Sequence, residues 1–199
     1  MAVVAIVDYD PAWPGQFGEL AAALRRELGD GALAIDHIGS TAVPGLAAKD
    51  VIDLQVTVAD LAQADGLAPA FERAGYVRSP YRQDHRPAED TSEPGRWEKR
   101  LWQSPPGARR VNAHVRVAGW PNQRYALLFR DYLRAHPAAA AAYARLKRAL
   151  AERFGGDLRA YTEVKDHACD LILVAAEDWA AGQAPDARWS VTQAPSRPR

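Results

Sequence analysis

A glycine–serine pair and a nearby aspartate are the residues of this chain whose types best suit phosphate chemistry. Gly39 and Ser40 end one apolar segment, and Asp53 lies within the next one. Glycine lets the backbone approach a phosphate closely, and serine offers a hydroxyl and an amide as donors. Lys49 could neutralise a phosphate, and His37 could hydrogen-bond to one. The pattern predicts a phosphate site, and a simple strand-ending turn is the alternative.

The surroundings of Asp53 predict which way its side chain faces. Ile52 and Leu54 flank it, and side chains alternate between the two faces of a strand, so Asp53 faces away from these apolar neighbours. A carboxylate in the middle of a strand is costly unless it is paired, hydrogen-bonded or bound to a metal. Asp53 is therefore expected to hold a metal and take part in catalysis, or to be a structural acid paired with a basic residue.

Charge is unevenly distributed along the chain. The 199 residues contain 25 basic and 25 acidic side chains, so the formal net charge is zero. Residues 1–75 contain 4 basic and 11 acidic side chains, whereas residues 76–154 contain 16 basic and 7 acidic ones. Overall neutrality argues against a general nucleic-acid coat, but the basic middle third could line an anion site. The alternative is that the acidic and basic segments simply meet across the surface.

Five residues in the predicted helices could contribute to such an anion site. Arg130 and Arg134 lie one helical turn apart, and Arg124 belongs to the same segment. Arginine matches the geometry of phosphate, so these three could form a basic wall, although a surface salt network is the alternative. Tyr161 and Lys165 are four residues apart, which places them side by side on a helix as further candidates.

The order of elements predicts an α+β fold. We expect a single domain over residues 1–182, with one sheet covered on one face by helices and a helical C-terminal half, followed by a flexible polar tail over residues 183–199. Residues 76–96 are expected to form a long exposed loop, with a strand possible at its start. Strands are predicted at 3–9, 33–38, 51–58, 97–103 and 110–117, the last two as a hairpin, and helices at 13–28, 61–74, 121–135, 137–154 and 157–181.

Several separated motifs resemble the GrpB family of the nucleotidyltransferase-like superfamily, and the resemblance covers about residues 5–180. The motifs lie at residues 9–14, 37–56, 112–115, 129–137, 143–147 and 161–165. The resemblance implies a mixed sheet in which a Gly-Ser turn precedes a strand with two alternating carboxylates, and a later strand supplies a third. In that superfamily the carboxylates hold Mg²⁺, which positions a nucleoside triphosphate.

This chain departs from the superfamily pattern at two of the three acidic positions. Asp53 matches the first carboxylate, but Gln55 stands at the second, and the later strand offers His114 and Arg116. Neither Gln nor His is a good ligand for Mg²⁺. The resemblance assigns His114 to a site motif and implies Mg²⁺ as a cofactor, whereas the missing acids argue against catalysis.

Two functions follow as alternatives. The first is a Mg²⁺-dependent, nucleotidyltransferase-like protein that binds a nucleotide or another phosphorylated small molecule. The second is a non-catalytic accessory domain, because GrpB-like domains also occur fused behind dephospho-coenzyme A kinase. The chain has no Gly-x-x-x-x-Gly-Lys-Ser/Thr phosphate loop, so it is not itself that kinase.

Other classes are disfavoured by composition. No run approaches 18 apolar residues and no secretory signal is visible, so a membrane location is not expected. Cys169 is the one cysteine, which excludes a disulfide scaffold and fits the cytoplasm. No nucleic-acid reader motif is recognisable, and nucleic acid is not an expected partner.

Overall fold

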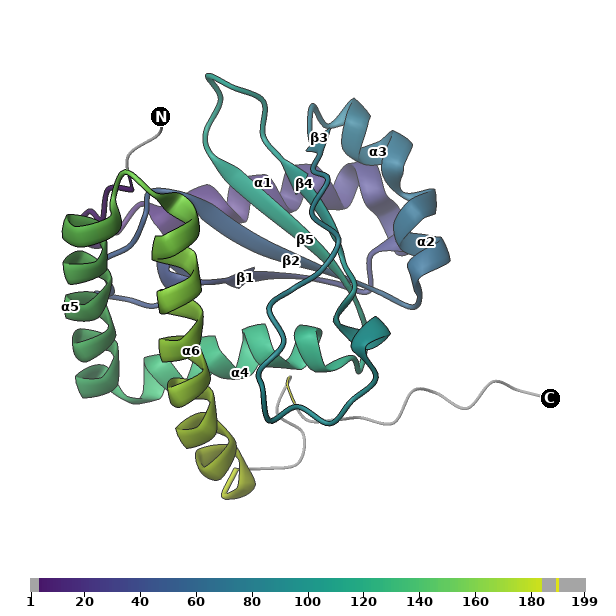
Figure 1. Cartoon of the computed structure of the whole chain (residues 1–199). Helices are drawn as coiled ribbons and strands as arrows, with labels where there is room; N and C mark the ends of the chain where they lie inside the picture. The colour runs from purple at the N-terminus through teal and green to yellow at the C-terminus, as the bar shows by residue number, and fades with distance from the viewer. Residues whose placement is uncertain (1–3, 184–188, 190–199) are drawn as a thin grey trace.

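The computed structural model describes residues 4–183 and Trp189. Five strands form one mixed sheet with the order β1-β2-β5-β4-β3 (Figure 1). Strands β2 and β5 are parallel neighbours at its centre, whereas the other pairs are antiparallel. The strands are β1 (Ala34–Ile38), β2 (Ile52–Val58), β3 (Val77–Arg78), β4 (Arg100–Gln103) and β5 (Val111–Val117). The prediction of an α+β fold is confirmed.

Helices cover both faces of this sheet. The helices are α1 (Trp13–Leu28), α2 (Leu61–Gly66), α3 (Ala68–Arg73), α4 (Pro121–Ala135), α5 (Pro137–Phe154) and α6 (Leu158–Ala181). In Figure 1, α1 lies behind the sheet, whereas α6 and the segment from β3 to β4 lie in front of it. The expectation of helices on one face is therefore wrong. Both faces of the central strands are buried, as is usual where strands run parallel.

Alternation along the central strands separates an apolar face from a polar one. Ile52, Leu54 and Val56 point into the main core with α1, α2 and α3. Asp53 and Gln55 therefore face the opposite side, towards α4 and α6. Burial of the apolar set holds the register of β2, because a shift by one residue would move every core side chain onto the polar face.

Two predicted elements differ from the structure. The strand expected over 3–9 is reduced to a single bridge between Val7 and Ala48. The helix expected over 61–74 is divided into α2 and α3 around Leu67, because Pro69 in the first turn of α3 has no N–H to continue α2. Elsewhere the predicted helices and strands agree with the structure to within three residues.

The C-terminal part of the chain is described through Gln183 and then at Trp189, which packs in a cluster with Leu127 and Leu128. The tail predicted over 183–199 otherwise lies outside the described residues. Within the described ranges, no helix is both long and apolar enough to cross a bilayer.

Candidate functional site

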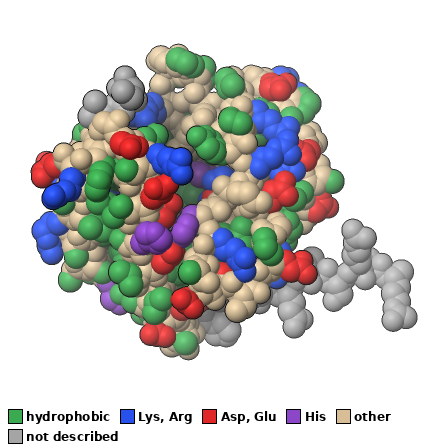
Figure 2. Space-filling view, in the orientation of Figure 1, with side chains coloured by type: hydrophobic (Ala, Val, Ile, Leu, Met, Phe, Trp, Pro, Cys, Tyr) green, Lys and Arg blue, Asp and Glu red, His purple; other side chains and the backbone are tan. Residues whose placement is uncertain are grey.

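The polar face of β2 and β5 carries the candidate site. The parallel register places Asp53 beside Asn112 and Gln55 beside His114. Since these residues occupy alternate positions on adjacent strands, their side chains share one face. Figure 2 shows this side of the molecule, where charged and histidine side chains surround a hollow near the centre of the view.

Asp53 is held as a carboxylate by three neighbours. Asn112 Nδ2 donates to Asp53 Oδ1 at 2.8 Å, and His114 Nε2 lies 3.7 Å from the same oxygen. Burial alone would raise the pKa of Asp53, but hydrogen bonding from His114 and Asn112 and the charge of Lys49 bring it below its ordinary value. Asp53 is therefore an anion at neutral pH, with Oδ1 facing Asn112 and His114 and Oδ2 facing the glycine turn.

Gly39 is required for that close approach. Its φ is 70°, a conformation that side chains rarely adopt, and a Cβ atom there would lie 2.7 Å from Asp53 Oδ2. The turn continues into a short 3₁₀ helix, Ser40–Ala42. The glycine thus brings the backbone of the turn against the carboxylate of the neighbouring strand.

Replacing Gly39 with alanine should lower the free energy of unfolding by about 2–4 kcal/mol, because backbone strain and a steric clash add. Gly119→Ala is the matched control, since Gly119 has a φ of 73° but open space around its Cβ position. Urea unfolding of both variants would measure the two effects. Equal losses in the two variants would show that the contact with Asp53 is not tight.

Lys147 on α5 reaches the serine of the turn. Its Nζ donates to Ser40 Oγ at 2.8 Å and to the Ala47 carbonyl at 2.6 Å, and it lies 4.7 Å from the centroid of the Tyr143 ring. The residue is only 3% exposed. Burial lowers the pKa of Lys147 to about 7. Cys169 opposes this shift, and the positive charges of neighbouring lysines add to it. Lys147 was not among the predicted site residues, although it is the last residue of the motif at 143–147 that the sequence comparison singled out.

Two predicted residues, Lys49 and Lys165, lie close to Lys147. The charges of both act on its pKa, and Lys49 also acts on Asp53. Lys49 Nζ is 5.7 Å from the centroid of the Tyr161 ring. Lys165 Nζ donates to Asp166 at 2.5 Å and lies 3.8 Å from Cys169 Sγ. Three ammonium groups therefore gather beside the Gly-Ser turn.

Tyr161 adds a polar group without a partner to this cluster. Its side chain is fully buried, and its hydroxyl makes no hydrogen bond within the described residues. Buried hydroxyls are nearly always satisfied in native proteins. An unpaired hydroxyl beside Lys49 thus marks a place where a ligand oxygen or a water molecule would be stabilised.

Three other predicted residues support the turn by contacts to its backbone and side chains. Arg130 Nη1 donates to the His37 carbonyl at 2.9 Å, and Arg134 Nε donates to the Ala42 carbonyl at 2.9 Å. His37 Nε2 lies 3.0 Å from Thr41 Oγ1, and its ring stacks on Phe17. Burial and the charge of Arg134 lower the pKa of His37 to about 4, so it is neutral at pH 7. Arg130 and Arg134 thus contact the backbone of the turn, and their role as a basic wall for phosphate stays a prediction.

Arg124 lies elsewhere in the structure. Its guanidinium pairs with both carboxylate oxygens of Glu177 on α6. The prediction that placed it with Arg130 and Arg134 relied on their shared helix. The partners that each guanidinium finds on other elements could not be seen from that spacing.

A buried ion network lies next to the site on the same face. Asp84, from the segment between β3 and β4, pairs with Lys99 at 2.5 Å and with Arg116 at 2.8 Å. Lys99 Nζ and Arg116 Nη2 each lie 3.3 Å from His114 Nδ1. Burial and these two cations lower the pKa of His114 to about 4. Because cations face Nδ1, we assign the proton of the neutral ring to Nε2, which faces Asp53.

This face does not fit the magnesium site that the superfamily resemblance implies. Mg²⁺ favours several oxygen ligands in an octahedral arrangement, yet Gln55 is the residue at the second acidic position, and its Oε1 accepts from Arg116 Nη1 at 2.7 Å. Arg116 and Lys99 contact His114, which neighbours Asp53, so two positive charges already lie close to that carboxylate. Among the described residues, no group of three or more His, Cys, Asp and Glu side chains could hold a metal ion.

Comparison with known proteins decides the family of this chain. The family model described as GrpB protein matches residues 3–174. The chain belongs to the GrpB family. The crystal structure of the conserved protein GrpB from Enterococcus faecalis has a TM-score of 0.71 and 33% identity, covering 89% of this chain and 99% of that one. The family expected from the sequence motifs is confirmed.

Curated relatives of this GrpB chain differ in length. It is 42% identical over 197 residues to a dephospho-CoA kinase of Mycolicibacterium paratuberculosis, covering 90% of this chain but 47% of the relative. It is 34% identical over 172 residues to UPF0157 protein BH1888 of Halalkalibacterium halodurans, covering 86% and 82% respectively. The chain therefore spans about half the length of the kinase relatives and most of the UPF0157 relative.

Proposed function

We propose that this GrpB protein binds a nucleotide or another phosphate-bearing small molecule at the Gly-Ser turn. The observation that carries the proposal is the Lys147 ammonium held on Ser40 Oγ at 2.8 Å, with Lys49 and Lys165 beside it. Lys49, Lys147 and Lys165 face two carboxylates, Asp53 and Asp166, so one positive charge is left over for an anionic ligand to neutralise. Charge-assisted hydrogen bonds to phosphate are among the stronger polar interactions in proteins.

Each group has a distinct part in this proposal. Ser40 and Lys147 would donate to phosphate oxygens, and the unpaired hydroxyl of Tyr161 would supply a further donor. Lys49 interacts electrostatically with both Asp53 and Lys165, so its positive charge would offset the repulsion between that carboxylate and a bound phosphate. Mg²⁺ would then be dispensable for binding, since lysine and arginine side chains supply the positive charge that the metal would otherwise provide.

An accessory role in a larger protein is the second candidate function. The similarity of this chain to about half of a dephospho-CoA kinase supports it, because that arrangement joins a GrpB-like part to another part in one polypeptide. The replacement of the second acid by Gln55 also favours binding over nucleotidyl transfer. A ligand-binding site and an accessory role are compatible if the ligand controls contact with a partner.

Thermal unfolding with phosphate ligands tests the proposed binding and its independence from Mg²⁺. ATP, AMP and inorganic pyrophosphate should each be added in EDTA and in excess Mg²⁺. A ligand at one hundred times its Kd stabilises the fold by about 2.7 kcal/mol, and we expect the shift to persist in EDTA and in Asp53→Asn. A shift that requires Mg²⁺ and vanishes in Asp53→Asn would instead support the metal-dependent enzyme. No shift with any of the three would contradict phosphate binding.

The affinity for phosphate should fall as pH rises above the Lys147 pKa of about 7. The second pKa of a phosphate is about 6, so between about pH 7.5 and pH 9 the ligand stays dianionic while unliganded Lys147 loses its proton. Binding must then take up a proton, and the affinity should fall by up to about tenfold per pH unit. Calorimetry in buffers of different ionisation enthalpy would detect that proton. A Lys147→Arg control should lack the pH slope.

A further inference from the structure

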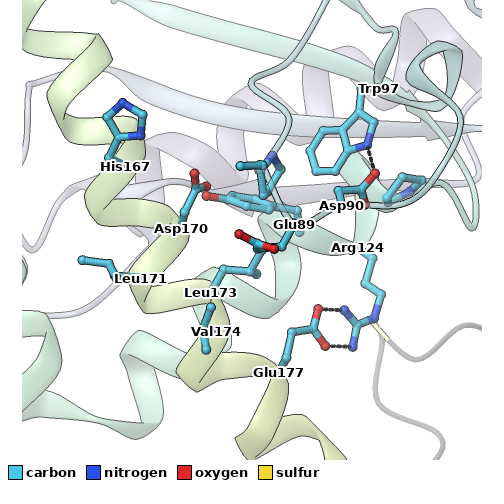
Figure 3. Close-up of a pocket in the computed structure, with 14 residues that line it drawn as sticks. Glu89, Asp90, Trp97, Arg124, His167, Asp170, Leu171, Leu173, Val174 and Glu177 are labelled. Carbon is cyan, nitrogen blue, oxygen red and sulfur yellow. Dashed lines mark hydrogen bonds and ion pairs between the residues drawn. The ribbon is translucent and has the colours of Figure 1, made fainter.

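A cavity lies apart from the lysine cluster, between α6, the start of α4 and the segment that precedes β4 (Figure 3). Its volume is about 490 Å³, within the range of small-molecule sites. Leu171, Leu173 and Val174 line it from α6, and Trp97 and Tyr125 line it from the other elements. Ser40, Lys49, Lys147, Tyr161 and Lys165 do not line this cavity, whereas Arg124, which the sequence had suggested for an anion site, does.

Two apolar side chains that α6 contributes to the cavity are unusually open to solvent. Leu171 is 76% exposed and Val174 is 59% exposed, although both lie on a helix whose other side packs against α4 and α5. Trp97 and Tyr125 opposite them are in edge-to-face contact, with ring centroids 6.0 Å apart. An apolar body inserted between these walls would remove Leu171 and Val174 from water, at roughly 25 cal/mol for each Å² buried, and would rest on the already buried Trp97.

The charged residues around the cavity are mostly acidic. Arg124 is the one lysine or arginine among the lining residues. Four carboxylates line the cavity: Glu89, Asp90, Asp170 and Glu177. Figure 3 shows them distributed on both sides of the space, from α6 and from the opposite segment. The cavity thus combines apolar walls with a negative rim.

Three of these carboxylates already have partners, and the fourth does not. Glu177 pairs with Arg124, and Asp170 lies 2.9 Å from His85 Nε2. Asp90 accepts from Trp97 Nε1 at 3.1 Å and from Arg86 Nε. Glu89 has no hydrogen bond or ion pair with any residue that the structure describes. It is the carboxylate available to a ligand.

We propose that this cavity binds a small organic cation, with its apolar body between α6 and the Trp97–Tyr125 wall and its ammonium or guanidinium group on Glu89. The aromatic wall favours the same charge, because a cation near the face of an indole or phenol ring is attracted to it. A net negative rim disfavours organic anions of the same shape. The site is independent of phosphate binding, and either can exist without the other.

Calorimetric titration with three matched probes tests this proposal. Phenethylamine, neutral 2-phenylethanol and anionic 3-phenylpropanoate have similar apolar bodies and different charges. We expect phenethylamine to bind at least about fivefold more tightly than the alcohol, in keeping with a partly exposed charge pair, and the anion to bind most weakly. Glu89→Gln should reduce the preference for the amine over the alcohol at least twofold, and the remaining preference would come from the rest of the acidic rim and the aromatic wall. Equal binding of amine and alcohol by the unmodified protein would overturn the proposal.

A cavity-filling variant locates the binding. Val174→Trp adds a large ring within the cavity at an exposed position, so it should fold normally and weaken phenethylamine binding at least tenfold. Val164→Trp is the matched control, because Val164 is exposed on the same helix but does not line the cavity. Equal effects of the two tryptophans, or none from Val174→Trp, would place amine binding elsewhere and contradict the proposal.

Discussion

Replacing Lys147 with methionine is expected to weaken binding of inorganic pyrophosphate about 10- to 150-fold at pH 6.5. The ammonium that donates to Ser40 Oγ is then absent, and hydrogen bonds to charged groups contribute about 1.5–3 kcal/mol. Methionine has a similar length and apolar stem, so it fills the same space beside Tyr143. Titration calorimetry in EDTA measures the loss directly.

The control for this variant lies one residue further along α5. Arg148 is partly exposed and pairs with Asp8, so Arg148→Met removes one positive charge without touching Ser40. We expect its affinity to change by less than about threefold, which is the scale of an exposed charge. Lys147→Met should also keep or raise the unfolding temperature, since a buried charge is costly. Equal losses of affinity in both variants would show that Lys147 acts only through its long-range charge, and would contradict a direct contact between Lys147 and the phosphate.

Replacing Asp84 with alanine should cause the largest loss of stability, about 3–5 kcal/mol, because Lys99 and Arg116 would remain buried without their carboxylate. For a chain of this size the melting temperature should fall by roughly 6–20 °C. Glu163→Ala is the control: it breaks the exposed Arg159–Glu163 pair and should cost less than about 1 kcal/mol. A loss below 1 kcal/mol in Asp84→Ala would show that the network does not hold the structure together.

Acidification provides a second measure of the same network. Burial alone would raise the pKa of Asp84, but the charges of Arg116 and Lys99 hold it well below its usual range. A carboxyl with a lowered pKa stabilises the fold above its unfolded-state pKa of about 3.9, and that stability is lost as the pH falls further. The difference in unfolding free energy between the unmodified protein and Asp84→Asn should therefore shrink below about pH 4.

Local sequence signals predicted the elements and the orientation of Asp53. Alternation between Ile52, Asp53 and Leu54 was enough to place the carboxylate on the polar face, because a strand has a period of two. Gly39 is a similar case, since its identity indicated a close backbone approach that the structure shows to be against Asp53. These features depend on residues near one another in the chain.

The remaining site residues depend on contacts between distant parts of the chain. Lys147 lies in an alanine-rich helix whose pattern does not indicate that the turn at Ser40 packs against it. Asp84 lies in an irregular segment, and its partner Arg116 is on a central strand. The contact of Arg130 with the His37 carbonyl was not predicted for the same reason, because that carbonyl is on another element. Spacing within one helix cannot reveal such partners.

The parallel pairing of β2 and β5 has a consequence for how the protein folds. Ile52 pairs with Val111, so the centre of the sheet closes only after the intervening chain has returned across the fold. Non-local pairing of this kind is slow because the loop must be closed before its contacts form. Asp53 and Asn112 belong to that late pairing. During refolding, helical signal should therefore recover before the amide protons between β2 and β5 become protected from exchange, which makes that protection a reporter of the last step of folding.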